Sequence, residues 1–161
     1  MLTGMLGPMS IPRAVAVVLD TGKVLVIKRY LRHRQAIDCV MCEAAGEVGP
    51  DCRGHHYAVL PGGHVEPGET AEEAALRELD EETTLSAKID RLLWTGSHNG
   101  RPAHYFLMAD VQGTAELSGD EAAANCQDNS FELLWADLHA LEAHRIHPTE
   151  IGARLPDLID A

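Results

Sequence analysis

The chain has 161 residues, of which 45% are hydrophobic and 24% charged, and these proportions exclude disordered and fibrous classes. Thirteen Lys and Arg against 25 Asp and Glu leave a formal net charge of −12, which disfavours DNA and anionic membranes as partners. A phosphate compound bound by so acidic a chain would need its charge offset, and a divalent cation is the obvious candidate.

The N-terminal segment carries no basic stretch, and no run reaches 18 apolar residues. The sequence therefore predicts neither a secretory signal nor a transmembrane helix. We expect one domain over residues 1–161, with a loose segment at 1–10. Four cysteines in a chain of this length do not indicate a disulfide scaffold. We expect a cytoplasmic protein whose cysteines are reduced or bound to a metal.

The first half of the chain predicts a hairpin followed by a long loop. Residues 13–19 and 23–28 are rich in apolar and β-branched types, and the turn Asp20–Gly22 separates them. Residues 29–56 break this pattern with basic residues, cysteines, histidines and glycines, so we expect a long inserted loop there. A short strand is predicted at 57–60.

The second half alternates helices and strands. A helix is predicted at 71–83, because Thr70 is a good N-cap and Glu73 stands at the capping-box spacing. The other predicted elements are strands at 86–97 and 103–111 around the turn Asn99–Gly100, a strand at 131–135, and short helices at 137–143 and 148–159. Interleaved elements of this kind predict an α/β layered fold with a mixed sheet.

Three glutamates of the predicted helix carry the strongest chemical signal. Glu78, Glu81 and Glu82 fall within about a third of the helix circumference. Neighbouring carboxylates repel one another unless a cation lies between them, and Mg²⁺ and Mn²⁺ prefer such oxygen ligands. The alternative is a solvated acidic face. The small residues on the same side of the helix favour a close approach of backbone instead; they are Ala71, Ala74 and Ala75.

The loop before the helix strengthens the metal hypothesis. Gly62 and Gly63 permit close backbone approaches, so that a loop carbonyl could join the carboxylates as a ligand. We expect Arg77 to hold Glu69 in a charge-assisted pair that fastens the loop to the helix. Taken singly, Arg77 could form an ordinary surface ion pair, and Glu69 could be an acid that the positive end of the helix dipole favours.

Residues 60–85, LPGGHVEPGETAEEAALRELDEETTL, resemble the Nudix box. That pattern is Gly, five residues, Glu, seven residues, Arg-Glu, an aliphatic residue, any residue, Glu-Glu, any residue, Gly and an aliphatic residue. It matches residues 63–85 at every fixed position except Thr84, which stands in place of the usual Gly. The resemblance implies a Nudix-type α/β/α sandwich with a mixed β-sheet. It also implies Mg²⁺- or Mn²⁺-dependent hydrolysis of a small-molecule nucleoside diphosphate derivative, by attack of water on phosphorus.

The resemblance implies individual roles as well. Glu78 and Glu82 would be the main metal ligands, and Glu81 a further ligand or the base that activates water. A carbonyl of Gly62 or Gly63 would complete the ligand set, and Arg77 and Glu69 would orient it. The family Gly suits a left-handed helix end, so the β-branched Thr84 implies a cost on the order of 1 kcal/mol.

Members of the family often use another acid from a later loop. The candidates are Asp120, Glu121, Asp128 and Glu132. Each of them singly is an ordinary surface charge. We favour Glu121, because we expect it in a polar loop between two strands.

The inserted loop carries a second possible metal site. Cys39-x2-Cys42-x9-Cys52-x2-His55 offers two close pairs of soft ligands suited to tetrahedral Zn²⁺, with His56 as an alternative fourth ligand. Such a staple would order a long loop that has little hydrophobic content. The alternative is a mobile loop with free cysteines.

Two further side chains are candidates for substrate binding. His64 follows the glycines of the loop, and Arg29 belongs to a basic cluster with Arg32, His33 and Arg34. Two other functions stay open at this point. One is a non-catalytic nucleotide-binding or regulatory domain of the same fold, and the other is an RNA 5′-end pyrophosphohydrolase. A homodimer is possible.

Overall fold

The computed structural model describes residues 11–47 and 49–160, so the expected loose segment 1–10 lies outside the described residues. The first half contains β1 (Arg13–Val17), β2 (Leu19–Asp20), β3 (Lys23–Leu31), a 3₁₀ turn (Ala36–Asp38), α1 (Val40–Ala45), β4 (His55–Val59), β5 (Gly62–His64) and α2 (Ala71–Thr83). The second half contains β6 (Ser86–His98), β7 (Arg101–Gln112), α3 (Gly119–Ala124), β8 (Asn129–Asp137), a 3₁₀ helix (Leu141–His144), α4 (Thr149–Arg154) and a last 3₁₀ helix (Leu155–Asp160).

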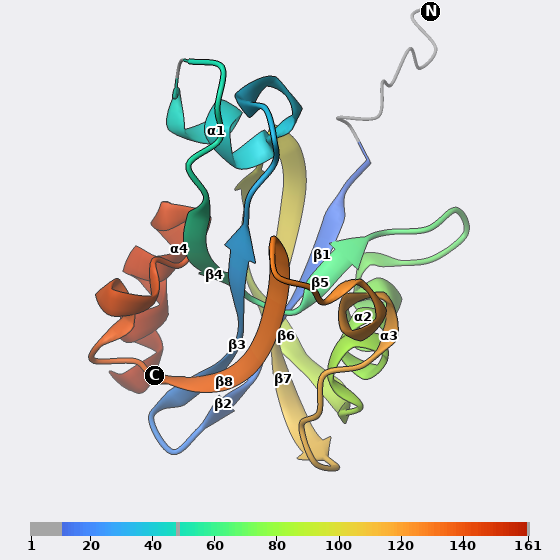
Figure 1. Cartoon of the computed structure of the whole chain (residues 1–161). Coiled ribbons are helices and arrows are strands. Elements are labelled where there is room, and N and C mark those ends of the chain that lie inside the picture. Colours follow the sequence, from blue (N-terminus) through green and yellow to red (C-terminus); the bar gives the residue numbers. More distant parts are fainter. Residues whose placement is uncertain (1–10, 48, 161) are drawn as a thin grey trace, which may run out of the picture.

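The strands form two sheets (Figure 1). One is mixed and has the order β5-β1-β7-β6, in which only β1 and β7 run parallel. In the other sheet, β3 pairs antiparallel with β2, β4 and β8. The predicted mixed sheet is therefore present, and the antiparallel strands around β3 form a second sheet beside it.

β1 shows why the layers stack as they do. Val15 and Val17 face a core shared with the second sheet and the C-terminal helices, whereas Ala14, Ala16 and Val18 face α2. Successive side chains of a strand point to opposite faces, so a strand buried on both faces reads as a continuous apolar run. Figure 1 shows α2 on one side of the strands and α4 on the other. The expected α/β/α arrangement is confirmed.

The predicted C-terminal helices were partly wrong. The helix expected at 137–143 is absent, because β8 continues to Asp137 in register with β3, and only a 3₁₀ helix at 141–144 follows. The helix expected at 148–159 is α4 at 149–154, followed by a 3₁₀ helix. No helix within residues 11–47 and 49–160 has the length and apolar character needed to cross a membrane.

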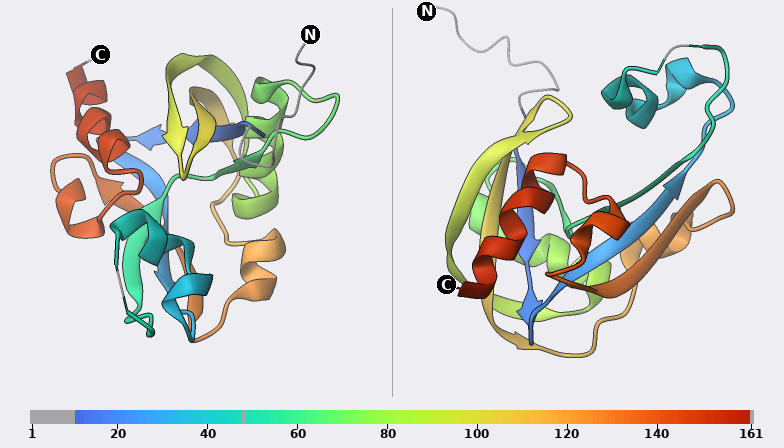
Figure 2. Two further views of the ribbon diagram at one scale, coloured as in Figure 1. Left: turned by 90° about the horizontal axis from the view of Figure 1, so that it is seen from above. Right: turned by 90° about the vertical axis from the view of Figure 1, so that its left-hand side faces the viewer.

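The long loop expected at residues 29–56 has structure of its own. β3 and β4 extend into it, and we call the described residues between them, 32–47 and 49–54, the insertion. It contains α1, whose N-cap Cys39 accepts a hydrogen bond through its sulfur from the Cys42 amide, and whose C-cap Gly46 is left-handed. Figure 2 shows the insertion standing out from the body at the end of β3 and β4. Six-residue helices lack a periodic signal of useful length, so neither α1 nor α3 was predicted.

Candidate active site

Two glycines let the β5 backbone lie against β1 and α2. Gly62 is opposite Val15 and Gly63 is opposite Ala14 in the β1–β5 pairing. A side chain at Gly62 would collide with the carbonyl oxygen of Ala14, and one at Gly63 would collide with the carboxyl group of Glu78. The glycines are thus required for close packing, as the sequence suggested.

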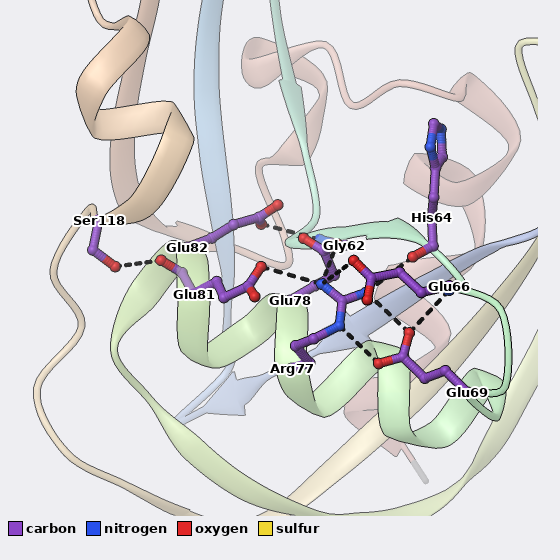
Figure 3. Close-up of polar contacts among 9 residues, drawn as sticks. All are labelled: Gly62, His64, Glu66, Glu69, Arg77, Glu78, Glu81, Glu82 and Ser118. Atoms are coloured by element: carbon purple, nitrogen blue, oxygen red, sulfur yellow. Dashed lines mark hydrogen bonds and ion pairs between the residues drawn. The ribbon is translucent and has the colours of Figure 1, made fainter.

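Arg77 is the centre of a charged network on α2 (Figure 3). Its guanidinium donates two hydrogen bonds to the Glu69 carboxylate, at 2.7 and 3.0 Å, and one each to Glu78 at 2.9 Å and Glu81 at 3.1 Å. It also donates to the carbonyl of His64 at 3.0 Å. The bond from Arg77 lowers the pKa of Glu69. A bidentate pair of this kind fixes the direction of both groups, so the loop is fastened to the helix in the expected way.

Glu82 is the most deeply buried carboxylate of the helix, at 4% exposure. It accepts a hydrogen bond from the Gly62 amide at 3.1 Å. Burial, followed by the charges of Glu121 and Glu78, raises the pKa of Glu82 to about 9. A carboxylate in this position either holds a proton or needs a cation beside it.

These groups surround one cavity of about 660 Å³, which we call the acid cavity. Its wall includes both loop glycines and the side chains of Arg13, His64, Glu66, Arg77, Glu78, Glu81, Glu82, Asp120 and Glu121. A larger cavity, of about 910 Å³, lies between β4 and the C-terminal helices and is not lined by these glutamates.

Glu121, the later acid favoured from the sequence, lines this cavity, although its setting differs from the expected one. It lies in the first turn of α3, not in a loop. Backbone contacts hold α3 against the end of α2, since the Ser118 amide donates to the Glu82 carbonyl at 2.9 Å and the Ser118 hydroxyl donates to the Glu81 carbonyl. Burial and then the Glu78 charge raise the pKa of Glu121.

Of the other candidate acids, Asp120 also lines the acid cavity, whereas Asp128 and Glu132 lie elsewhere. Asp128 is 3.5 Å from Arg32 in an exposed ion pair, and Glu132 is opposite Lys28 in the sheet. Neither lines the acid cavity.

Arg13 is a cavity residue that sequence reasoning missed. Burial, offset in part by Glu82 and Glu78, lowers the pKa of its guanidinium, and its Nε has no hydrogen-bond partner among the described residues. It is opposite His64 in the β1–β5 pairing, so it lies beside the glycine loop. The only sequence signal was a cation at the start of an apolar strand.

The two predicted substrate residues have different positions. His64 lines the acid cavity, and in Figure 3 its imidazole points away from the carboxylates. Arg29 does not line this cavity. Its guanidinium lies 3.9 Å from the centre of the Phe131 ring and bonds to Asn129 and to the Ser130 carbonyl.

The predicted zinc ligands come together where the insertion joins the first residue of β4. The ligand atoms of Cys39, Cys42, Cys52 and His55 all lie within 4.8 Å of one another. We call these four residues the cysteine cluster. The fourth cysteine, Cys126, is exposed and free.

Comparison with known proteins decides the family. The model of the NUDIX domain matches residues 9–155. The chain belongs to the Nudix family. An RNA pyrophosphohydrolase of Erythrobacter litoralis is 30% identical over 130 residues, which cover 66% of this chain and 77% of that protein. An ADP-ribose pyrophosphatase of Methanocaldococcus jannaschii is 43% identical over 68 residues, covering 39% of this chain and 40% of the relative.

Solved structures agree with the fold. A MutT NUDIX hydrolase from Burkholderia pseudomallei is 23% identical, covers 91% of this chain and 97% of its own, and superposes with a TM-score of 0.62. The predicted family, fold class and activity as a Nudix pyrophosphohydrolase are confirmed. The Nudix family generally uses divalent cations.

Proposed function

We propose that the acid cavity binds Mg²⁺ or Mn²⁺ and hydrolyses a diphosphate linkage in a small-molecule nucleoside diphosphate derivative. The proposed ligands are Glu78 and Glu82, Glu81 as a further ligand or as the base, a carbonyl of Gly62 or Gly63, and Glu121. One observation carries the proposal. The Glu78, Glu82 and Glu121 carboxylates line one cavity, and the charges of Glu78 and Glu121 both disfavour the charged form of the buried Glu82.

The residues fit a hard divalent cation. Carboxylate and carbonyl oxygens are the ligands that Mg²⁺ and Mn²⁺ prefer. Glu78 fills the space that a side chain at position 63 would occupy, so the loop backbone and this carboxylate are in contact. The bound ion would polarise the phosphoryl oxygens of the substrate and lower the pKa of water.

The chain's own residues supply orientation and proton transfer. Arg77 and Glu69 hold Glu78 and Glu81 in fixed directions. The side chain of Glu81 is 54% exposed, a position compatible with accepting a proton from a solvent water. Arg13 lines the same cavity as a permanent cation, and we assign it to a phosphate oxygen of the substrate.

A release assay over several substrate classes tests the proposal. It covers nucleoside triphosphates, nucleotide sugars, dinucleoside polyphosphates and ADP-ribose, each with Mg²⁺ and with Mn²⁺. We expect turnover of at least one class, lost on adding a chelator of divalent cations. Tight nucleotide binding without turnover of any class would favour the non-catalytic alternative.

A second function is favoured by one comparison. The relative that is aligned over 77% of its length is named an RNA pyrophosphohydrolase. A 5′-triphosphorylated RNA oligonucleotide therefore belongs in the assay. The net charge of −12 argues against a polyanionic substrate, so we expect the small molecules to be turned over faster. The cytoplasmic location and the possible homodimer stay predictions.

A further inference from the structure

The insertion has a core of its own that consists mainly of cysteines. Its buried members are Ala36, Cys39, Cys42 and Cys52, with Leu31 and Met41 packed against them. The two main cores contain none of these residues. So small a cluster buries little apolar area, and segments of this size usually need a disulfide or a metal ion to hold one structure.

The cysteines are not joined by disulfides. All three are free and buried, and the sulfur of Cys42 lies 3.2 Å from Nε2 of His55. Cys39 already accepts a hydrogen bond at its sulfur, from the Cys42 amide at 3.4 Å. None of the three sulfurs is committed to a disulfide, so all three can bind a metal ion.

We propose that Cys39, Cys42, Cys52 and His55 bind one Zn²⁺ ion that holds the insertion in its fold. This site is separate from the acid cavity and does not depend on the proposed catalytic role of that cavity.

The geometry suits a closed tetrahedral site. Zn–S bonds of about 2.3 Å place the ligand atoms of a tetrahedron roughly 3.8 Å apart. The four ligand atoms lie within 4.8 Å of one another. The difference of about 1 Å is within the reach of small rotations of the side chains. Three sulfurs and one imidazole are soft and borderline ligands, which select zinc over Mg²⁺ or Mn²⁺.

The four ligands connect all parts of the insertion to the sheet. Cys39 and Cys42 belong to the first turn of α1, and His55 is the first residue of β4, paired with Leu31 of β3. Cys52 lies just before β4. One ion would thus fasten α1 onto the end of the β3–β4 hairpin.

This fastening would fix the walls of two cavities. Met41 and Glu47 of the insertion line the cavity of about 910 Å³. Val40 and Glu43 of α1 line another cavity, of about 510 Å³. Arg13 lines both this cavity and the acid cavity. The expected role of zinc is therefore to shape the surroundings of the active site.

The test measures metal content on the full chain, purified without added zinc. We expect about one equivalent of zinc by elemental analysis. Cys42→Ser and His55→Ala should lose it. Cys126→Ser, which alters the one cysteine outside the cluster, should keep it. His55→Cys should also keep it, since four thiolates form an equally good zinc site.

A second measurement covers variants that fail to fold. Wild-type protein loaded with Co²⁺ should show the near-ultraviolet charge-transfer absorption of cobalt–thiolate bonds, which carboxylate ligands do not produce. Glu82→Gln should leave this absorption and the zinc content unchanged. In the native zinc form, Cys126 should react at once with a thiol reagent, and the other three cysteines only after a chelator is added.

Three results would overturn the proposal. One is less than about a tenth of an equivalent of zinc with all four thiols reacting freely. Another is two thiols missing after denaturation without reductant, which would indicate a disulfide. The third is a zinc content that Cys42→Ser and His55→Ala leave unchanged.

Discussion

The acid cavity beside α2 and the cysteine cluster of the insertion both gather metal-ligand side chains, but on different supports. The glutamates stand on a helix of thirteen residues, with Ala74, Ala75 and Leu79 buried against the sheet. Arg77 orients two of them through its hydrogen bonds. In the insertion three of the four ligands, the cysteines, form most of the core. Metal should therefore serve chemistry in the first region and folding in the second, and the variants of Glu82, Arg77 and Glu69 test the first half of this contrast.

The largest effect is expected at Glu82. Glu82→Gln removes one charge from the proposed ligand set and should lower kcat by about 10³-fold, equivalent to roughly 4 kcal/mol of the activation barrier. Folding should be retained, because the amide oxygen can still accept the hydrogen bond from Gly62. Steady-state kinetics and circular dichroism measure the two outcomes.

The matched control is Asp80→Asn, which neutralises an exposed acid of the same helix outside the cavity. It should retain wild-type kcat. Full activity in Glu82→Gln would remove Glu82 from the ligand set.

A smaller effect is expected at Arg77. Lysine keeps the charge but cannot reproduce the bidentate pair with Glu69 or reach Glu78 and Glu81 together. Loss of such an orienting partner typically costs 10–100-fold, so we expect kcat for Arg77→Lys to fall by about that factor. Glu69→Gln should behave similarly, and the double variant should be little worse than either single one, because both act through one pair.

The control for this series is Arg91→Lys. Arg91 forms an exposed ion pair with Asp90 at 3.0 Å and lies outside the cavity. Additive losses in the Arg77–Glu69 double variant would show that the two residues act separately.

Stability of the metal-free protein should depend on pH through Glu82. Its pKa rises from an ordinary 4.5 to about 9 on folding. Between these values the folded chain holds a proton that the unfolded chain has released, so stability should fall as pH rises through this window. Glu82→Gln should flatten the slope and stabilise the metal-free protein at pH 7 by roughly 3 kcal/mol.

Denaturant unfolding in the presence of a magnesium chelator, at several pH values, measures this effect. Adding Mg²⁺ should stabilise the wild type at neutral pH and have little effect on the variant. Equal pH slopes for both proteins would mean that Glu82 is charged in the folded chain without an ion.

The sequence predicted the site residues well where they are close along the chain, and poorly where segments distant in the sequence meet. Capping at Thr70 and the spacing of the glutamates predicted α2 and its acidic side, since both are local features. The position of α3 depends on contacts of Ser118 with the carbonyls of Glu81 and Glu82, and no local pattern encodes those.

Arg13 illustrates the same limit. It reaches the cavity only because β1 pairs with β5. The cysteine spacing predicted a cluster, but the short helix α1 that carries Cys42 is too brief to leave a periodic signal.

The smallest effect is expected at Thr84, where the chain departs from the Nudix box. Thr84 is left-handed at φ 62°, a strain of about 1 kcal/mol, and its hydroxyl donates to the Thr114 carbonyl at 2.8 Å. Such a bond contributes about 0.5–1.5 kcal/mol.

Thr84→Gly should remove both the strain and the hydroxyl bond, and leave the free energy of unfolding within about 0.5 kcal/mol of wild type. Thr84→Ala keeps the strain and loses the bond, so its urea midpoint should be lower than that of Thr84→Gly. Both variants should keep wild-type kcat, because the carboxylates lie upstream. A Thr84→Gly midpoint as low as that of Thr84→Ala would mean that the left-handed backbone at position 84 costs the folded chain no appreciable strain.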